Sequence, residues 1–496
     1  MSSGYTDPWQ HYIITSISRQ KKQNFLPSSS FHLVYWIYQM RNGGIKMQAE
    51  NTQRLTEGVI WKQILFFSLP IIAGNLFQWL YNTVDSIVVG NFVGGEALAS
   101  VGAGTSVINL LIGLFSGLTT GAGVIVAKYF GAGLEEKLRR SIHTSSVFTI
   151  VFGLFMTILG ILSSDWILRA ISTPSNVLDG ANLYLRIYFA GIIPMMIYNM
   201  GAAILRAVGD SKTPLYYLGV SSIINIVLDT VFVSVFRMGI AGVGIATVIA
   251  QIVSAILVVL KLARSKEVYR LEWKLLKADR SMLLEILKVG IPVGIQQTII
   301  GFSNIFVQYY INLYGSAAMA AWVTFNKIDG LVFLPVLGFG VAITTFTSQN
   351  VGAGKPDRVL KGTHVTLLMN ILYAAVSSFF FFLAAEPITR IFTNEVDIIQ
   401  YGMRMIRTLI PFYVLTAFMQ VLSNVISGAG YSFASMMIMI GNLCIVRVLY
   451  LMIMTPRSND IATIFQSYII TWVTCAICLL LYYRKGGWRK SLHANA

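Results

Sequence analysis

Twelve stretches of mainly apolar residues, each long enough to cross a lipid bilayer, constrain the fold of this chain more than any other feature. A membrane-spanning helix needs about 20 such residues, and lipid offers its backbone no hydrogen-bond partner outside the helix. The stretches lie near residues 64–89, 97–127, 142–163, 183–205, 215–236, 240–260, 284–312, 317–347, 363–385, 401–427, 433–454 and 460–483. The sequence therefore predicts an all-α integral membrane protein with twelve transmembrane helices.

The basic residues collect in alternate connections between these spans. Only 12% of the 496 residues are charged, yet Lys and Arg outnumber Asp and Glu by 37 to 21, which gives a formal net charge of +16. The excess lies in the second, fourth, sixth and eighth connections and in the C-terminal tail. Cytoplasmic loops of membrane proteins carry such an excess, so we expect a plasma-membrane protein, of a bacterial inner membrane, with both termini in the cytoplasm. Nucleic acid is then not needed as a partner.

The second half of the chain repeats the first after about 221 residues. Four pairs of motifs are in register: Leu69-Pro70-Ile71 with Ile291-Pro292-Val293, Lys128-Tyr-Phe-Gly-Ala-Gly133 with Gln349-Asn-Val-Gly-Ala-Gly354, His143 with His364, and Arg206-Ala-Val-Gly-Asp210 with Ser427-Gly-Ala-Gly-Tyr431. Six spans per repeat give both halves the same orientation. We therefore expect two six-helix lobes related by an internal repeat around a central cavity, which is an architecture of secondary transporters.

This repeat divides the chain into five predicted segments. They are a polar N-terminal extension at 1–46, an N-terminal six-helix lobe at 47–261, a cytoplasmic linker between the lobes at 262–283, a C-terminal six-helix lobe at 284–484 and a basic cytoplasmic tail at 485–496. The apolar patch of the extension is too short to span a membrane. The extension is therefore either dispensable or an interfacial anchor.

Two polar stripes run along spans of the N-terminal lobe, and each contains an aspartate. The stripes consist of Asn75, Gln78, Asn82 and Asp85 on the first span and of Ser221, Asn225 and Asp229 on the fifth. Spacings of three and four residues place each set on one helical face. Carboxylates are costly inside a membrane, and burial beside a second carboxylate favours the protonated form. We expect Asp85 and Asp229 to face each other across a wet pocket and to couple transport to an ion.

The other polar residues of this lobe allow two interpretations. The predicted lining of a substrate or ion pocket consists of Asn75, Gln78, Asn82, Asn225, Tyr198 and Asn199. The side-chain amides can instead hold helices together by hydrogen bonds. Asp85, close to the end of its span, can likewise cap a neighbouring helix.

The C-terminal lobe has a different set of polar and charged residues within its spans. They are Gln297, Asn304 and Gln308 on the seventh span, Lys327 and Asp329 on the eighth, and Arg447 on the eleventh. Lys327 and Asp329 are two residues apart and cannot share a helical face. Arg447 can pair with Asp329, so these charges are either a buried structural ion pair or part of the transport site.

The motifs together resemble those of the MATE (multidrug and toxic compound extrusion) family over about residues 55–485. The resemblance rests on Leu69-Pro70, on Val84-Asp85 followed by Val89-Gly90, on Asn225-Ile-Val-Leu-Asp229, on Gln349-Asn350 with Gly352-Ala353-Gly354, and on the duplicated twelve-span plan. It implies an antiporter with coupling carboxylates in the N-terminal lobe, at Asp85 and Asp229. The branch that uses a glutamate on the seventh helix is not matched, since Gln296 and Gln297 stand there.

The function expected from these features is secondary active export of organic cations or amphiphilic drugs in exchange for H⁺ or Na⁺. Protonation of the aspartates from outside would repack the first span around Pro70, a bending point because proline removes a backbone hydrogen bond. We expect no enzymatic activity, no cofactor other than the coupling ion, no metal, and a monomer in the lipid bilayer. The alternatives are a lipid-linked oligosaccharide flippase of the same superfamily, or a membrane enzyme or receptor without a transport cycle.

Overall fold

The computed structural model describes residues 54–171, 173–458 and 460–489, so the predicted extension at 1–46 lies outside the described residues. Within these ranges the chain forms helices and turns but no strand. The helices of the first half are α3 (Ile60–Val88), α4 (Gly95–Gly131), α5 (Glu135–Ala170), α6 (Ser175–Ala190), α7 (Ile192–Ala207), α8 (Lys212–Thr230) and α9 (Gly239–Arg264). Those of the second half are α10 (Arg280–Asn312), α11 (Ser316–Gly352), α12 (Pro356–Leu383), α13 (Ala385–Arg390), α14 (Val396–Leu409), α15 (Tyr413–Gly428), α16 (Ser432–Ile440), α17 (Arg447–Met454) and α18 (Ala462–Lys485).

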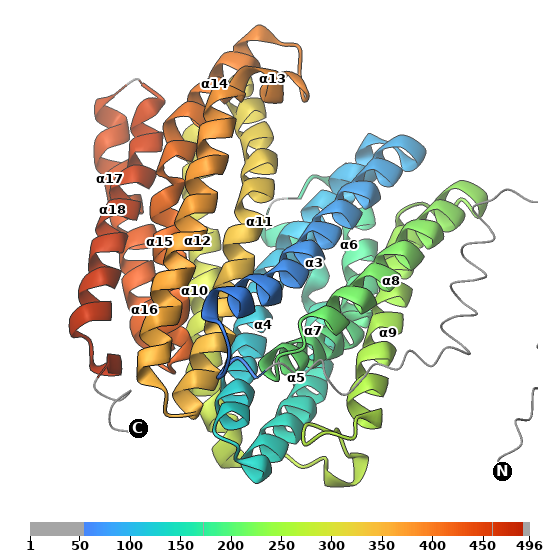
Figure 1. The fold of residues 1–496 in the computed structure, drawn as a ribbon. Helices are drawn as coiled ribbons and strands as arrows, with labels where there is room; N and C mark the ends of the chain where they lie inside the picture. Colours follow the sequence, from blue (N-terminus) through green and yellow to red (C-terminus); the bar gives the residue numbers. More distant parts are fainter. Residues whose placement is uncertain (1–53, 172, 459, 490–496) are drawn as a thin grey trace, which may run out of the picture. The chain divides into compact units, whose positions relative to one another are not determined.

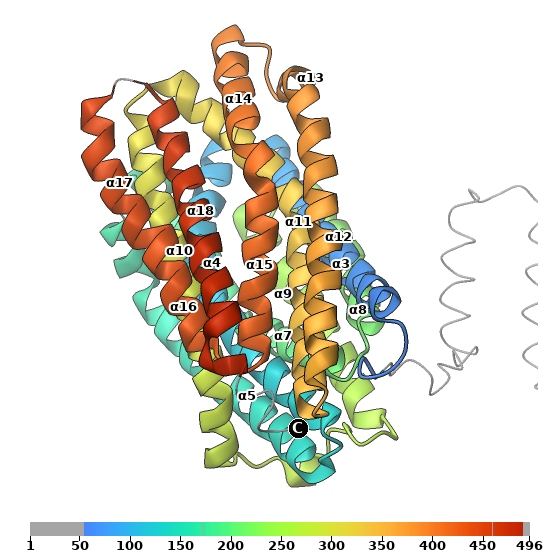
Figure 2. The same cartoon turned by 60° about the vertical axis from the view of Figure 1, so that its left-hand side comes forward.

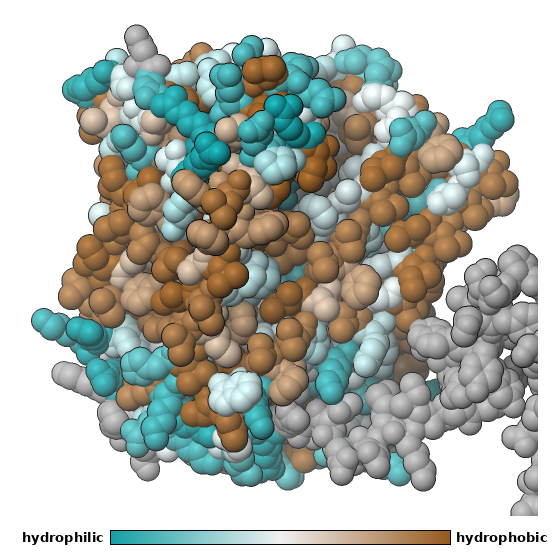
Figure 3. Space-filling view, turned by 45° about the horizontal axis from the view of Figure 1, so that its top comes forward, coloured by the Kyte–Doolittle hydropathy of each residue, from teal (hydrophilic) through white to brown (hydrophobic). Residues whose placement is uncertain are grey.

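The number of membrane spans agrees with the sequence. Eleven helical segments of the described chain are long and apolar enough to cross a membrane, and the bent pair α6–α7 raises the number to twelve. Figure 3 shows the apolar residues as a band with polar residues on both sides of it. The protein is therefore a multi-pass membrane protein, and the predicted all-α fold is confirmed.

The fourth span is bent, which its apolar pattern did not predict. Helices α6 and α7 meet at Gly191 with an angle of 49° between them. Pro194, in the first turn of α7, has no N–H to donate to the carbonyl group of Ala190, so a continuous helix would lack one bond there. In the second half, Pro411 lies in a short 3-10 turn between α14 and α15. Both halves thus interrupt this span, with a proline at a different position in each.

The internal repeat extends to the ends of individual helices. Helices α4 and α11 both have 37 residues, α7 and α15 both have 16, and their ends correspond at a distance of 221 residues. Glycines with positive φ recur at the same distance, as the pairs Gly94 and Gly315, Gly133 and Gly354, and Gly209 and Gly430. Glycine adopts this conformation without steric cost. The repeat is therefore confirmed in both the spans and the turns.

The two halves meet where α4 crosses α10, the most extensive helix pair of the described chain. A Cβ atom on Gly117 would lie 2.0 Å from the backbone nitrogen of Gly294, and one on Gly121 would lie 2.6 Å from the Cα atom of Gly290. Only residues without a side chain let two helix backbones approach so closely. Figures 1 and 2 show α10 within the bundle of the second half, beside α16 and α17.

Helix α3 contributes to the hydrophobic cores of both halves. Ile64, Phe67 and Ile71 belong to the apolar cluster that fills the second half. Val88, near the other end of the helix, belongs to a cluster of the first half. Pro70 lies inside the helix, beside the residues that pack against the second half. The region around this proline therefore lies where α3 passes from one core to the other.

The turns that follow α4 and α11 touch each other at the end of the molecule where the basic connections lie. A Cβ atom on Gly131 would lie 2.0 Å from the carbonyl oxygen of Gln349, and one on Gly352 would lie 1.9 Å from the carbonyl oxygen of Lys128. The motifs that revealed the repeat in the sequence are therefore in direct backbone contact. They bring the two halves together at this end, which we call the basic end.

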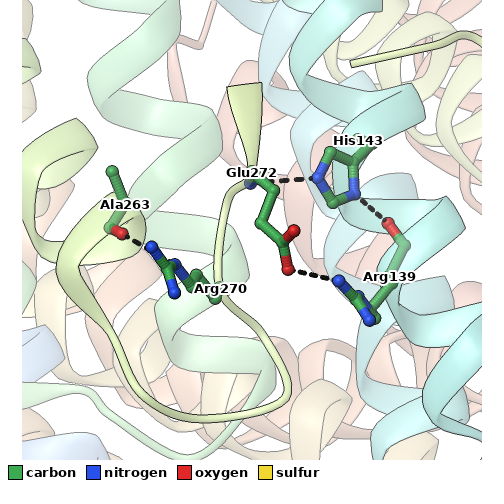
Figure 4. Close-up of polar contacts among 5 residues, drawn as sticks. All are labelled: Arg139, His143, Ala263, Arg270 and Glu272. Atoms are coloured by element: carbon green, nitrogen blue, oxygen red, sulfur yellow. Dashed lines mark hydrogen bonds and ion pairs between the residues drawn. The ribbon is translucent and has the colours of Figure 1, made fainter. Parts of the chain in front are cut away.

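The linker between α9 and α10 is held against α5 (Figure 4). Nδ1 of His143 donates to the carbonyl oxygen of Arg139 at 2.6 Å, and Nε2 accepts from the backbone N–H of Glu272 at 3.1 Å. Arg139 also forms an ion pair with Glu272. A carbonyl oxygen can only accept and a backbone N–H can only donate, so this geometry requires neutral His143 with its proton on Nδ1.

Candidate functional site

A cavity of about 640 Å³ lies inside the first half, where α3, α4 and α6–α9 surround it. Its size is in the range of pockets for drug-sized ligands. Helices α11 and α15 of the second half add Val341, Thr344, Thr345 and Asn424 to its wall. The described hydrophobic core of the first half forms two separate clusters, whereas that of the second half is largely one. Most of the cavity wall therefore belongs to the first half.

The structure brings together nearly all residues that the sequence singled out in the N-terminal lobe. Those that line the cavity are Pro70, Asn75, Gln78, Asn82, Asp85, Tyr198, Asn199 and Asn225. They lie on α3, α7 and α8, so the three helices turn their polar faces toward one space. Asp229 is fully buried and is not part of the cavity wall.

Asp85 and Asp229 lie close enough for their carboxyl groups to interact directly. Asp85 is half-buried and reaches the cavity, while Asp229 is inaccessible to solvent. Oδ1 of Asp85 and both carboxyl oxygens of Asp229 have no well-aligned hydrogen-bond donor among the described residues. Two adjacent carboxyl groups without donors cannot both be ionised at low cost in an apolar setting. This pair can therefore hold a proton or a cation.

Polar and aromatic groups surround the carboxyl pair. Nδ2 of Asn225, one helical turn before Asp229, lies 3.5 Å from the hydroxyl of Thr247 on α9. The rings of Tyr184 and Tyr188 on α6 are 6.4 Å apart, and both residues line the cavity. Aromatic faces attract organic cations, and their edges pack against apolar parts of a ligand. The wall thus combines one acidic side chain with aromatic surface.

Two other predicted pocket residues use their polar atoms within the protein. The hydroxyl of Tyr198 donates to the carbonyl oxygen of Pro214 at 3.0 Å, and Nδ2 of Asn199 donates to that of Met195 at 2.9 Å. The side-chain oxygen of Asn199 takes no part in that bond. Both residues therefore line the cavity, while Tyr198 also joins α7 to α8 and Asn199 joins two successive turns of α7.

None of the polar residues predicted in the C-terminal lobe lines this cavity. Gln297, Gln308 and Lys327 are outside its wall, and the ammonium group of Lys327 lies 6.0 Å from the ring centre of Phe392. Gln308 donates to Asn312 at 2.6 Å on the same helix. The structure thus separates them from the carboxyl pair.

Asp329 and Arg447, for which the sequence left an ion pair open, form no ion pair with each other among the described residues. Asp329 accepts a hydrogen bond from the hydroxyl of Tyr413. The guanidinium of Arg447 stacks 4.2 Å from the ring centre of Tyr468, and its NH1 donates to Asn304 at 3.3 Å. Each of the two charged groups thus has a partner other than the opposite charge.

Some residues of the cavity wall do not stand out in the sequence. Tyr184, Tyr188 and Gln251 line the wall, but single polar groups on apolar spans do not reveal which face they occupy. The four-residue spacing of Tyr184 and Tyr188 indicates only that the two tyrosines share one face of their helix. Arg206 follows the predicted fourth span at 183–205, whereas in the structure it lies in the last turn of α7 and lines the cavity. No cluster of three or more metal-ligating side chains occurs in the described part of the chain.

A duplicated bundle of membrane-spanning helices with a polar, carboxylate-bearing cavity defines the class of secondary transporters. Within this class, a family model described as MatE matches the chain twice, over residues 70–231 and 292–453. The chain therefore belongs to the MatE family. The two matches have the same length and cover one half each, as the internal repeat requires.

Known proteins of similar sequence and structure agree with this assignment. The chain is 29% identical over 386 residues to the probable multidrug resistance protein YoeA of Bacillus subtilis, across 76% of this chain and 83% of that protein. It is 26% identical to YpnP of the same organism, across 88% and 97%. A crystal structure of a MATE in the bent conformation matches with a TM-score of 0.83 at 25% identity, across 88% of this chain and 97% of that chain.

Proposed function

We propose that this protein is a secondary active multidrug efflux antiporter, which exports organic cations or amphiphilic drugs in exchange for H⁺ or Na⁺. The observation that carries the proposal is the proximity of Asp85, in the wall of a drug-sized cavity, to the buried Asp229. The relatives YoeA and YpnP carry the name of probable multidrug resistance proteins, which supports the same function.

In this proposal the carboxyl pair exchanges one cationic ligand for another. When the pair is ionised, Asp85 attracts an organic cation whose apolar body lies against Tyr184 and Tyr188. When a proton or Na⁺ binds the pair, that attraction is lost and the drug leaves. Because Pro70 weakens the hydrogen bonding of α3 near the passage between the two cores, bending there can move Asp85 relative to the second half.

The proposed location is the plasma membrane of a bacterium, with the basic end and both termini in the cytoplasm. The excess of Lys and Arg in alternate connections supports this orientation. In this orientation, the contact between the turns after α4 and α11 closes the cytoplasmic side of the cavity. The proposed working form is a monomer.

A lipid-linked oligosaccharide flippase is the less favoured function. A flippase for a pyrophosphate ligand needs cations in its central cavity, and the sequence offered Lys327 and Arg447 for that role. Neither residue lines the cavity, and Arg447 is engaged by Tyr468 and Asn304. Arg206 is the one basic side chain of the described wall, and the carboxyl group of Asp85 in the same wall disfavours an anionic ligand. A membrane enzyme or receptor is also less favoured, because a duplicated bundle around one cavity suits alternating access.

Transport by the purified protein in proteoliposomes tests the proposal. We expect a fluorescent organic cation to move against its own concentration gradient when H⁺ or Na⁺ flows down an imposed gradient in the opposite direction. The dye should therefore accumulate on the side where the coupling ion is more concentrated. A proton uncoupler should stop the movement if H⁺ is the coupling ion, and removal of Na⁺ should stop it if Na⁺ is. Movement that neither treatment affects would contradict antiport, and protein-free liposomes serve as the control.

A further inference from the structure

Another cavity, of about 650 Å³, opens at the surface of the basic end between the start of α3 and the start of α12. The predicted spans of these helices begin near residues 64 and 363, so this cavity lies at the edge of the apolar band. Figure 2 shows α3 and α12 side by side. We call this cavity the α3–α12 groove, and its wall includes Gly58, Trp61, Lys355, Asp357, Arg358 and Lys361.

Basic side chains outnumber carboxylates in the α3–α12 groove. Lys355, Arg358 and Lys361 line it, against the single carboxylate of Asp357. Glu57 is an electrostatic neighbour of Arg358 and adds a second negative charge nearby. None of the three basic residues forms an ion pair with a residue that the structure describes. The groove therefore keeps a net positive charge.

Two of these basic residues also hold the groove in shape. Arg358 donates to the carbonyl oxygen of Glu57 at 2.8 Å, and Lys355 donates to that of Thr56 at 3.0 Å. Carbonyl groups do not neutralise a charge, and an ammonium group has three donors, of which Lys355 uses one here. Lys361 is exposed and forms no hydrogen bond or ion pair with the described part of the chain. The groove therefore keeps donors for a ligand.

The internal repeat shows which counter-charge is missing from the α3–α12 groove. The residue equivalent to Lys361 in the first half is Arg140, which forms ion pairs with a glutamate of its own helix and with Asp279 before α10. Gly58 stands at the position equivalent to Asp279, and Asp357, one turn before Lys361, forms no ion pair with it in the described structure. The corner that two carboxylates neutralise in the first half therefore stays positive in the second.

An apolar stripe leads from the groove along α12 into the membrane. Leu368 and Leu372 follow Lys361 at seven and eleven residues, on one helical face, and they are 70% and 61% exposed. On the opposite wall Trp61 is 48% exposed, whereas Met282, the equivalent residue of the repeat, is buried. Tryptophan is enriched where a membrane meets water. The groove thus places positive charge directly above exposed apolar side chains.

We propose that the α3–α12 groove binds an anionic phospholipid, with the phosphate of its headgroup at Lys361 and its acyl chains along α12. Basic pockets between membrane helices bind the headgroups of anionic lipids. A free phosphate would match the charge but would leave Trp61 and the apolar stripe uncovered, so the groove fits a lipid. The inference does not depend on what the cavity of the first half transports.

Quenching of Trp61 fluorescence by labelled lipids tests this site in the full-length protein. The protein is reconstituted in phosphatidylcholine vesicles that contain either phosphatidylglycerol or phosphatidylcholine with a nitroxide group near the start of one acyl chain. The part of the fluorescence that Trp61→Phe removes reports on the groove, so each variant is measured with and without this tryptophan. The two quenching curves give the ratio of phosphatidylglycerol binding to phosphatidylcholine binding.

The variants change the charge at Lys361 and leave the residues that shape the groove in place. Lys361→Gln removes the charge, and Lys361→Arg keeps it. Lys266→Gln is the matched control, because Lys266 is an exposed lysine of the linker that does not line the groove.

We expect the wild type to prefer phosphatidylglycerol and Lys361→Gln to lower the binding ratio about fivefold, as for one lysine near a membrane surface. Lys361→Arg and Lys266→Gln should keep the wild-type ratio. An unchanged ratio in Lys361→Gln overturns the proposal. A wild type without preference also overturns it, as for a groove that another part of the protein fills. Loss of the preference when inorganic phosphate is added assigns the groove to a free phosphate and overturns the lipid site.

Discussion

The contact between Asp85 and Asp229 determines the chemistry that the cavity can perform. Asp229 is inaccessible to solvent, and its carboxyl oxygens have no well-aligned donor in the described structure. A buried carboxylate without a donor is costly, so the pair is stable when it shares a proton or binds a cation. Transport follows if the two bound forms favour different arrangements of α3 and α8.

At the scale of the single residue, we predict that Asp229→Asn abolishes ion-driven efflux. The amide keeps the shape of the carboxyl group but cannot gain or lose a proton, so the gradient is no longer coupled to export. Efflux of a fluorescent cation from proteoliposomes, measured with an imposed gradient, checks this. Efflux at the wild-type rate from Asp229→Asn would falsify the role of this residue.

Asp329→Asn is the matched control for that experiment. Asp329 is also a carboxyl group within the spans, but it lies outside the cavity wall and accepts from Tyr413. An asparagine oxygen can accept the same hydrogen bond. Asp329→Asn should therefore retain gradient-driven efflux.

At the scale of secondary structure, the two halves are held together where helices cross at glycine residues. Gly117 and Gly121 of α4 face Gly294 and Gly290 of α10 at distances that exclude a methyl group. In lipid, close packing of this kind stabilises helix pairs that gain nothing from the hydrophobic effect. The crossing therefore fixes how the cavity-bearing half sits against the other half.

We predict that Gly117→Ala destabilises the protein strongly. Its Cβ atom would lie 2.0 Å from the backbone nitrogen of Gly294, so the helices must move apart. Overpacking typically costs about 1–3 kcal/mol, and a clash with backbone is at the upper end. Gly219→Ala is the control, because nothing lies within 4 Å of its added atom. Thermal unfolding in detergent should show a lower Tm for Gly117→Ala and an equal or higher Tm for Gly219→Ala.

The linker between α9 and α10 gives a second prediction for a structural element. His143 is buried and joins the carbonyl of Arg139 to the backbone N–H of Glu272. We expect His143→Ala to lower the Tm, because two hydrogen bonds worth about 0.5–1.5 kcal/mol each are lost.

The internal repeat supplies the comparison for this histidine. His364, the equivalent residue of the second half, is exposed, and its imidazole forms no hydrogen bond with a residue of the described ranges. His364→Ala should therefore have a Tm close to that of the wild type. Equal shifts for both variants would mean that the contact with the linker is not what stabilises the protein at His143.

At the scale of the whole molecule, the repeated turns determine which side of the cavity is closed. Gly131 contacts Gln349, and Gly352 contacts Lys128, through backbone atoms alone. The side-chain amide of Gln349 also donates to the carbonyl oxygen of Ala207 at 2.7 Å, a hydrogen bond from α11 to the end of α7. Alternating access requires these contacts to break when the cavity opens at the basic end.

We predict that Gly352→Ala opens the cavity at the basic end. The added methyl group would lie 1.9 Å from the carbonyl oxygen of Lys128, so the two turns must separate. The readout is labelling of Ala203→Cys, a cavity position, by a membrane-impermeant maleimide in inside-out vesicles. The background replaces the native cysteines Cys444, Cys475 and Cys478 with alanine.

Labelling should rise severalfold in Gly352→Ala. Gly487→Ala, at the same end of the molecule and with nothing within 4 Å of its added atom, should label as the parent protein does. Unchanged labelling of a folded Gly352→Ala variant would show that the turns do not close the cavity.

Much of this architecture could be predicted from the sequence because the signals are local or periodic. A span needs about 20 apolar residues, and the repeat recurs at one fixed distance, so neither depends on knowing which helices touch. The polar stripes on the first and fifth spans were also readable, since helical geometry puts residues three and four apart on one face. The bend of the fourth span was missed because apolar residues continue through Gly191 and Pro194.

Tertiary structure alone decided which side chains meet. Asp229 is buried beside Asp85, Asp329 bonds to Tyr413 instead of Arg447, and Arg206 faces the cavity. The rotation and partners of each helix depend on packing between residues hundreds of positions apart, such as the glycines of α4 and α10. The sequence by itself therefore determined the spans, the repeat and the polar faces, because backbone hydrogen bonding and lipid act on each segment separately. The pairing of the carboxyl groups and the lining of the cavity required the packed molecule, because they exist only between segments.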